Sequence, residues 1–263
     1  MEENHNNMMA WNTGVYQSWV NRFGTPEEAA TKIKEEPQKR IGSVLEYMGE
    51  TVKNKRIINL LGSNGNKAVA LSLLGANVTV VDFSKGNEMY ATELAQHAGV
   101  KIRYLMSDVL KLPEDELTGD YDIVFMEFGI LHYFKDLQPL FDLVSKLLCK
   151  SGRLVLQDFH PISTKLISSR GTTAKIRKHK VTGNYFDTSL EEKEVSHSKF
   201  LDEDEKDPTT HKVYLRNWTL GEVVTAIASQ GLYIKVLEEL PNQSSEIFDK
   251  GIPKTFTVIA EKL

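Results

Sequence analysis

The sequence predicts an α/β fold, in which helices cover both faces of a doubly wound, mostly parallel seven-stranded sheet. Between residues 56 and 160, short apolar runs alternate with segments of helical pattern. Runs this rich in Val, Ile, Leu and Phe are typical of strands that are buried on both faces of a parallel sheet. Their alternation with helices indicates a layered α/β domain.

Each element of this core has its own signal. The expected strands are Arg56–Leu61, Asn77–Val81, Lys101–Leu105, Tyr121–Phe128 and Arg153–Gln157, and the expected helices are Lys67–Leu74, Glu88–Ala98 and Leu137–Leu148. Gly75 and Gly99 follow two of these helices, where glycine readily takes the left-handed conformation of a helix end. Near the C-terminus, an amphipathic helix up to Gly231 precedes two strands, 232–240 and 253–262. These two strands are expected to pair as an antiparallel hairpin at the sheet edge.

The rest of the chain extends this core into one domain. Thr25 is expected to begin an N-terminal helix that Pro37 divides, because proline is not tolerated inside a helix. A long segment after residue 160 breaks the strand–helix rhythm and predicts hairpin or lid structure. The expected parts of the single domain 1–263 are an N-terminal helical cap (1–55), the core (56–160), an insertion or lid (161–212), and a C-terminal helix with edge strands (213–263).

Composition and charge limit the classes of function. The 263 residues include 32 Lys and Arg against 36 Asp and Glu, a formal net charge of −4. This balance argues against nucleic-acid binding through broad electrostatics. Cys149 is the only cysteine, which excludes intramolecular disulfides and cysteine-rich zinc sites. No apolar stretch approaches the roughly 18 residues of a membrane span, and a signal-peptide pattern is absent from residues 1–12. We therefore expect a soluble cytoplasmic protein that acts away from membranes.

A glycine-containing turn after the first predicted strand is the most informative segment. Gly62-Ser63-Asn64-Gly65 separates a buried strand from a helix that begins near Lys67. Glycine lets the backbone approach a ligand closely, and the helix N-terminus offers free amides. Ligands of open parallel sheets bind beyond the carboxyl ends of the strands. The segment predicts a binding loop, with an ordinary strand–helix turn as the alternative.

Two acids follow the next strands. Asp82 ends the second strand, where a carboxylate can accept hydrogen bonds from both ribose hydroxyls of a nucleotide. The alternative is a helix N-cap. Asp108 lies just past the third strand and is expected to reach an adenine amino group, with a solvated loop acid as the alternative. The nicotinamide fingerprint G-x-G-x-x-G is absent, because Asn64 and Lys67 occupy its second and third glycine positions.

With these residues in this order, the chain resembles the class I S-adenosylmethionine-dependent methyltransferases over about residues 40–160. The resemblance implies S-adenosylmethionine as cofactor and the methyltransferase form of the Rossmann-like fold. The family's usual loop reads acid-x-Gly-x-Gly-x-Gly, whereas Leu60 stands here at the acid position and Asn64 and Asn66 at the second and third glycines. The implied cofactor-binding residues are Gly62, Ser63, Asn64 and Gly65 for the methionine part, Asp82 and Phe83 for the ribose, Asp108 and Val109 for the adenine, and Glu127 and Phe128 for the pocket wall.

The resemblance also implies where an acceptor and a base would lie. His132 follows the fourth strand and is a candidate general base, because an unperturbed imidazole titrates near pH 6.5. Tyr133 beside it is expected to face the substrate. Asp158 and His160 end the fifth strand on one side of an extended chain, which is the arrangement of an oriented base. Structural roles in packing, capping or loop formation are the alternatives for these residues.

The insertion and the N-terminal cap offer further contacts. Tyr185, Phe186 and Tyr214 are expected to line an apolar substrate pocket. A basic group comprising Arg170, Lys175, Arg177 and Lys178 would attract an anion, unless it is a solvated face. The N-terminal Trp11, Tyr16 and Trp19 either fold over the cofactor or pack their helix onto the domain.

The sequence therefore predicts transfer of a methyl group from S-adenosylmethionine to a small-molecule acceptor whose identity and oxygen, nitrogen or carbon nucleophile stay open. No metal is required by this chemistry, and the dispersed histidines show no metal-ligand spacing. One alternative is a non-catalytic protein that binds S-adenosylmethionine as a sensor or partner subunit. The other is a nicotinamide-dependent oxidoreductase, which the missing glycine disfavours. Nucleic acid is an unlikely partner, and the oligomeric state stays open.

Overall fold

The structure of the chain is a computed structural model that describes residues 2–168, 180–205, 212–242 and 251–263. The basic group from Arg170 to Lys178 lies outside the described residues. Among the helices of the described ranges, none has the length and apolar character to cross a membrane.

The N-terminal cap is helical, as predicted. Its elements are α1 (Glu2–Asn12), α2 (Val15–Phe23), α3 (Pro26–Glu35), α4 (Pro37–Ile41) and a 3-10 helix at Ser43–Met48. Thr25 caps α3 through a reciprocal pair with Glu28: the Glu28 amide donates to Thr25 Oγ1 at 3.3 Å, and the Thr25 amide donates to Glu28 Oε2 at 2.8 Å. Pro37 divides α3 from α4, because proline begins a helix well but cannot continue one.

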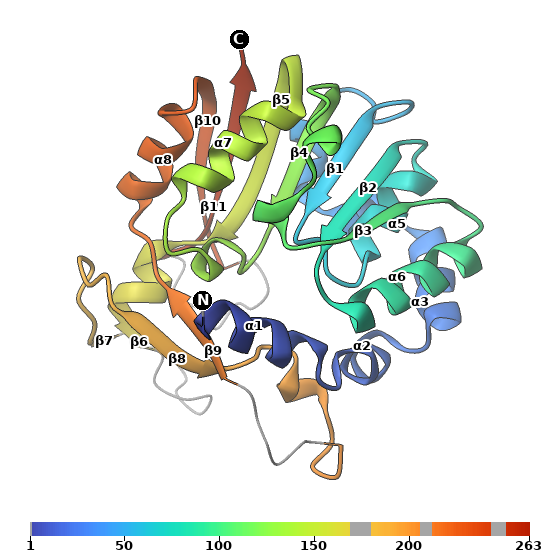
Figure 1. Cartoon of the computed structure of the whole chain (residues 1–263), viewed down its shortest axis with the longest axis horizontal. Helices are drawn as coiled ribbons and strands as arrows, with labels where there is room; N and C mark the ends of the chain where they lie inside the picture. Colours follow the sequence, from blue (N-terminus) through green and yellow to red (C-terminus); the bar gives the residue numbers. More distant parts are fainter. Residues whose placement is uncertain (1, 169–179, 206–211, 243–250) are drawn as a thin grey trace.

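The central sheet confirms the predicted mostly parallel, seven-stranded arrangement (Figure 1). Its strands are β1 (Arg56–Leu60), β2 (Asn77–Asp82), β3 (Arg103–Met106), β4 (Tyr121–Glu127), β5 (Leu148–Phe159), β10 (Leu232–Pro241) and β11 (Pro253–Lys262), in the spatial order β10-β11-β5-β4-β1-β2-β3. β11 is antiparallel to both of its neighbours. The antiparallel strand therefore lies one place inside the edge, which β10 occupies.

Helices cover both faces of the sheet. They are α5 (Asn66–Leu73), α6 (Lys85–Ala98), α7 (Gln138–Leu147) and α8 (Leu220–Ala228). Ile57 packs into the hydrophobic cluster with α3, α5 and α6, whereas its neighbour Ile58 packs into the cluster with α7 and α8. Successive side chains of a strand point to opposite faces, so a strand covered on both sides is apolar throughout.

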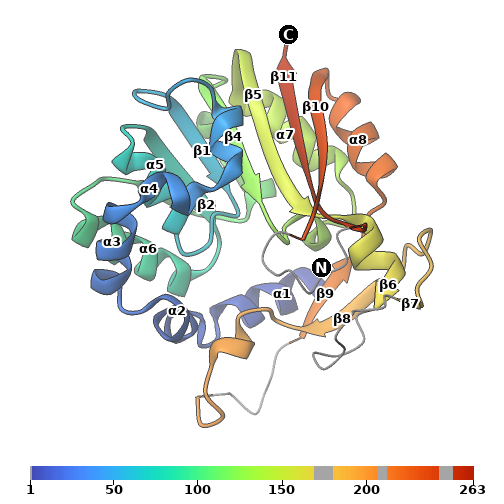
Figure 2. The same ribbon diagram turned by 180° about the vertical axis from the view of Figure 1, so that it is seen from behind.

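The insertion forms two small hairpins. β6 (Ile167–Ser168) pairs with β7 (Lys180–Val181), and β8 (Leu190–Glu194) pairs with β9 (Lys212–Arg216). β9 runs beside α1, where the Asn7 side chain accepts from the Tyr214 amide at 2.8 Å and donates to its carbonyl at 3.4 Å. Figures 1 and 2 show α1, β8 and β9 as a layer across the carboxyl ends of the parallel strands. Because β9 belongs to this layer, the insertion continues to Arg216, beyond the boundary expected at residue 212.

Candidate functional site

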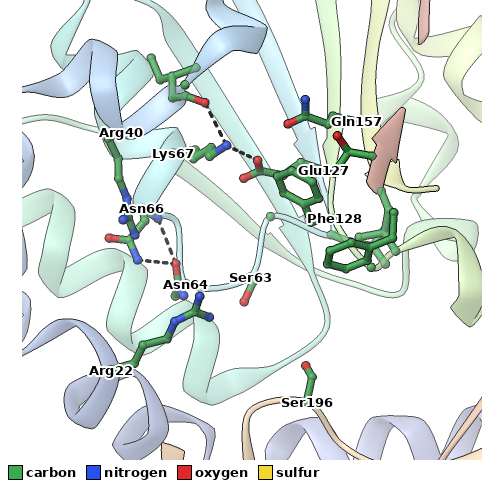
Figure 3. Close-up of a pocket in the computed structure, with 18 of the residues that line it drawn as sticks. Arg22, Arg40, Ser63, Asn64, Asn66, Lys67, Glu127, Phe128, Gln157 and Ser196 are labelled. Carbon is green, nitrogen blue, oxygen red and sulfur yellow. Dashed lines mark hydrogen bonds and ion pairs between the residues drawn. The ribbon is translucent and has the colours of Figure 1, made fainter. Parts of the chain in front are cut away.

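A cavity of about 840 Å³ lies at the carboxyl ends of the parallel strands. Figure 3 shows its wall, to which the β1–α5 loop, α2, α4, the ends of β4 and β5, and the insertion all contribute. Small-molecule sites typically measure about 300–1,000 Å³. The cavity is therefore large for such a site and lies where open α/β sheets bind ligands.

The β1–α5 loop is shaped by two glycines with different roles. A Cβ on Gly62 would lie 2.6 Å from Asn59 Oδ1 and 2.8 Å from Val80 Cγ1, so packing against the sheet requires glycine there. Gly65 has a φ of +70°, and its Cβ would lie 2.7 Å from the Cβ of Ala91. Gly62, Ser63 and Asn64 line the cavity, whereas Gly65 lies behind it and shapes the turn. Gly65, which the resemblance implies as a cofactor-binding residue, is thus not part of the cavity wall.

Asparagines replace the family's later glycines in this loop. The Asn64 Oδ1 atom accepts from the Asn66 amide at 3.2 Å and from Asn66 Nδ2 at 2.7 Å (Figure 3). The pair closes the first turn of α5 and leaves both side chains at the cavity wall. Side-chain hydrogen bonds of this kind stabilise turns.

Asp82 lies at the end of β2 beside this loop. Its carboxylate accepts from the Ser63 amide at 3.1 Å, the Ser84 amide at 2.9 Å and Asn87 Nδ2 at 3.1 Å. Burial raises the pKa of Asp82, and these donors act against that rise. Asp82 and Phe83 both line the cavity.

Asp108 and Val109 lie outside the cavity wall, in contrast to the sequence expectation. Asp108 accepts from the Leu110 amide at 3.1 Å and pairs with Lys111 at 3.4 Å, so it caps a short 3-10 helix. Val109 is buried in the hydrophobic core. The capping interaction turns the Asp108 carboxylate back onto its own loop in this structure.

Glu127 ends β4 at the centre of the cavity wall. It forms an ion pair with Lys67, which also donates to the carbonyl of Ile41 at 2.9 Å (Figure 3). Burial raises the pKa of Glu127, and the charges of Lys67 and Arg40 oppose this rise. Phe128 follows with a φ of +40°, in a turn that continues through Gly129. This turn presents the Phe128 ring to the cavity.

The predicted Asp158–His160 pair is not present. Asp158 instead accepts from the amides of Gly129 at 2.6 Å, Leu131 at 3.2 Å and Ile130 at 3.4 Å. His160 accepts from the Ile162 amide at 3.1 Å through Nδ1, so Nε2 carries the proton toward Glu239. The strand ends at Phe159, so side-chain alternation no longer holds at His160. Neither residue lines the cavity, and the prediction of an Asp–His base is wrong.

The Asp158→Ala substitution is expected to lower the free energy of unfolding by about 2–4 kcal/mol, because it leaves buried amides without an acceptor. The turn that presents Phe128 would lose its anchor at the same time. Chemical denaturation measures the loss. Asp136→Ala is the matched control, because Asp136 caps a single exposed amide, that of Gln138, and should cost about 1 kcal/mol. Equal losses in the two variants would contradict the anchoring role.

His132 and Tyr133 both line the cavity, and their rings lie 4.6 Å apart. Tyr133 accepts a 2.9 Å hydrogen bond from Trp11 Nε1. Tyr185 and Tyr214 do not line the cavity. The Tyr185 hydroxyl accepts from the Leu220 amide, and the Tyr214 hydroxyl donates to Glu192. The first contact ties the insertion to α8 and the second lies within the β8–β9 pair, so the expectation that both tyrosines line the substrate pocket is wrong for this cavity.

Some of the N-terminal aromatic residues lie at the cavity and others pack their helix onto the domain, so both expected alternatives occur. Trp11 and Trp19 line the cavity, whereas Tyr16 packs on α6 and donates to Glu93 at 2.6 Å. Trp19 Nε1 donates to Asn87 Oδ1 at 2.7 Å. Asn87 Nδ2 in turn donates to Asp82, so Asn87 links the N-terminal cap to that carboxylate.

Basic side chains of the wall were missed by the sequence argument, because they come from five separate segments with no common motif. The wall includes two acids, Asp82 and Glu127, and six basic residues: Arg22, Lys39, Arg40, Lys67, Lys199 and Lys254. Arg40 Nε is buried without a hydrogen-bond partner in the described structure. An orphaned buried donor at a cavity indicates a missing acceptor.

Residues 61–156, from the β1–α5 loop to β5, match the family model described as a methyltransferase domain. This segment is therefore similar to a methyltransferase domain, and the chain shares its fold with solved S-adenosylmethionine-dependent methyltransferases. Among solved structures, an S-adenosylmethionine-dependent methyltransferase of Mesorhizobium loti shares the fold, with a TM-score of 0.62 and 21% identity, over 84% of this chain and 98% of that one.

Curated members of the family are similar over part of the chain. The demethylmenaquinone methyltransferase of Thermus thermophilus is 32% identical over 109 residues, which are 41% of this chain and 48% of that protein. The ubiquinone biosynthesis O-methyltransferase of Rickettsia prowazekii is 34% identical over 107 residues, 38% of this chain and 41% of that protein. The chain thus spans about half the length of these relatives or less.

The cavity fits the family's cofactor, S-adenosylmethionine. The Asp82 carboxylate is an acceptor at the end of β2, where the family holds a ribose. The unpartnered Arg40 Nε offers a donor suited to a carboxylate on the side of Asn66. Phe83 offers an apolar surface near Asp82. These groups match the hydroxyl, carboxylate and apolar parts of the cofactor.

Proposed function

We propose that the chain transfers a methyl group from S-adenosylmethionine to a small-molecule acceptor. One observation carries the proposal: a single cavity joins the Gly62–Asn66 loop and Asp82 to the turn at Phe128. Cofactor groups and an acceptor would then share one enclosed space. One of the two curated relatives is named for demethylmenaquinone and the other for ubiquinone biosynthesis, and both names support an acceptor of small size.

Each part of the cofactor would contact its own side chains in one half of the cavity. Asp82 would accept hydrogen bonds from the ribose hydroxyls through the oxygen lone pairs that its present donors do not use. Arg22 and Arg40 would hold the carboxylate of the methionine part from the side of Asn64 and Asn66 (Figure 3). Glu127 would accept from the ammonium group, and its ion pair with Lys67 opposes the rise in the pKa of Glu127 that burial causes.

The acceptor half lies toward Phe128, His132 and Tyr133. The cofactor supplies an electrophilic methyl on a sulfonium, which is a good leaving group. The protein then mainly orients the acceptor, an effect worth several kcal/mol. His132 is placed to take a proton if the nucleophile must lose one. Lid closure by α1, α2 and the β8–β9 hairpin would exclude water during transfer.

His132 gives this proposal a pH signature. Burial and the charge of Lys193 lower the pKa of His132 from 6.5 to about 4, whereas Glu191 acts in the opposite direction. The imidazole is therefore neutral at pH 7, and the lowered pKa also makes it a weaker base than an ordinary histidine. We expect methyl transfer to persist as pH falls through 6.5 and to decline only toward pH 4. A decline centred near pH 6.5 that is absent from His132→Gln would contradict this assignment.

The same lowered pKa affects stability. Between pH 6.5 and 4, His132 takes up a proton in the unfolded chain but stays neutral in the folded chain. The free energy of unfolding therefore falls as pH is lowered through this range, and the stability present above pH 6.5 is lost. Wild type should lose up to about 3 kcal/mol more than His132→Gln over this range. Denaturant titrations at pH 7 and pH 4.5 measure the difference. Parallel losses would show that the ring titrates normally.

Transfer of labelled methyl from S-adenosylmethionine to a cell extract tests the proposal. Label should appear in the small-molecule fraction and be absent with the Asp82→Ala variant. Label in RNA or protein would contradict a small-molecule acceptor. Cofactor binding without any transfer would favour a non-catalytic sensor, and binding of NAD in preference to S-adenosylmethionine would favour an oxidoreductase.

A further inference from the structure

Charge at the cavity wall is unbalanced. Lys67 pairs with Glu127, and Lys39 pairs with Glu36. The other four basic side chains of the wall, Arg22, Arg40, Lys199 and Lys254, have no carboxylate partner among the residues that the structure describes. Like charges gathered on one wall give the cavity a positive potential, which favours an anionic ligand.

S-adenosylmethionine does not supply that charge. It carries one carboxylate against an ammonium and a sulfonium, so its formal charge at neutral pH is positive. The carboxylate can satisfy the arginines beside the β1–α5 loop, but the loaded cavity would be more positive than the empty one. A second ligand that carries negative charge would offset this excess.

Lys254 stands at the acceptor half. It is the second residue of β11, directly before Thr255, which is paired with Phe159 at the end of β5. Its ammonium lies 5.9 Å from the centre of the Phe159 ring, and its carbonyl accepts from the His160 amide at 2.9 Å. The backbone at Lys254 is thereby fixed to the end of β5, and the residue lines the cavity.

Two aromatic rings beside Lys254 are only partly covered. Phe128 and Phe159 are each 40% exposed, and their ring centres lie 5.4 Å apart. Both line the cavity. Large apolar side chains that remain this open in a concave site provide a surface for an apolar ligand.

We propose that the methyl acceptor is an apolar, ring-sized molecule with an anionic group, a carboxylate or a phosphate, which Lys254 binds while Phe128 and Phe159 hold the apolar body. This inference rests on the proposed function, since it assigns the second ligand of the same cavity. Lys199, which lies 5.0 Å from the Phe200 ring in the lid, is the competing cation.

Calorimetry with matched probes tests the inference, both with and without saturating S-adenosylhomocysteine. The probes are 2-naphthoate, its neutral analogue 2-naphthamide, and 2-naphthyl phosphate. We expect at least one anion to bind about tenfold more tightly than the amide, as for a charge-assisted hydrogen bond. The stronger of the two anions identifies the anionic group.

The Lys254→Met variant, which keeps an apolar stem, should remove this preference and leave affinity for S-adenosylhomocysteine unchanged. Lys199→Met is the matched control and should keep most of the preference. The inference is overturned if neither anion binds more tightly than the amide, or if Lys199→Met loses the preference and Lys254→Met does not. Failure of S-adenosylhomocysteine to bind would instead count against the proposed function. The preference for the anionic probes would then still be measured in the titrations that contain no S-adenosylhomocysteine.

Discussion

Asp82→Ala is expected to weaken binding of S-adenosylmethionine by roughly 10- to 100-fold, the effect of losing hydrogen bonds to a charged acceptor. The carboxylate has two roles in the structure. It offers acceptor capacity to the cavity, and it ties the Ser63 amide of the β1–α5 loop to the end of β2. Its removal would therefore both delete a ligand contact and loosen the loop that lines the methionine half.

Asp108→Ala is the matched control for this prediction. Both acids follow strands of the sheet, but Asp108 caps its own short helix outside the cavity. The structure predicts that cofactor affinity survives this substitution. Calorimetric titration of the two folded variants separates the roles. Unchanged affinity in Asp82→Ala, or an equally large loss in Asp108→Ala, would show that the cofactor is held elsewhere.

Gly86→Val is expected to displace α2 and to reduce methyl transfer by at least about tenfold. A Cβ on Gly86 would lie 2.4 Å from Val15 Cγ1 and 3.3 Å from the Tyr16 amide nitrogen, so α2 cannot keep its place. Val15 is 1% exposed and has no free space to move into. Trp19 on the same helix would then lose its hydrogen bond to Asn87, which positions Asp82.

Gly221→Val is the control, because Gly221 holds the same position in the first turn of α8 and has no atom within 4 Å of its Cβ site. Valine there should change stability by less than about 1 kcal/mol. Hydrogen exchange of α1 and α2, measured beside transfer activity, reports undocking directly. Normal exchange and full activity in Gly86→Val would mean that the cap is not part of the lid.

The arrangement of the sheet followed from the sequence because apolar periodicity depends on local neighbours. Buried strands such as Tyr121–Glu127 are apolar on both faces, and Asp82 was placed correctly because the end of a parallel strand fixes which sheet edge it occupies. The β1–α5 loop was found by its glycines, although packing against Asn59 and Val80 explains Gly62 better than ligand approach.

Side-chain partners were harder to foresee, since they depend on residues far away in the sequence. Asp158 binds amides 27–29 residues earlier, and His160 faces Glu239, 79 residues later. Neither set of partners lies at a regular sequence spacing from its residue, so no motif identifies it. For the same reason, the sequence did not reveal that Arg22 and Lys254, at opposite ends of the chain, meet at one cavity.

The most direct test of the central claim is a crystal structure of the protein with S-adenosylhomocysteine. We predict that the ligand occupies the 840 Å³ cavity, with its ribose hydroxyls on Asp82, its carboxylate toward Arg22 and Arg40, and its sulfur toward Phe128. A ligand bound outside this cavity, or bound in it with the ribose away from Asp82, would contradict the assignment of the cofactor site.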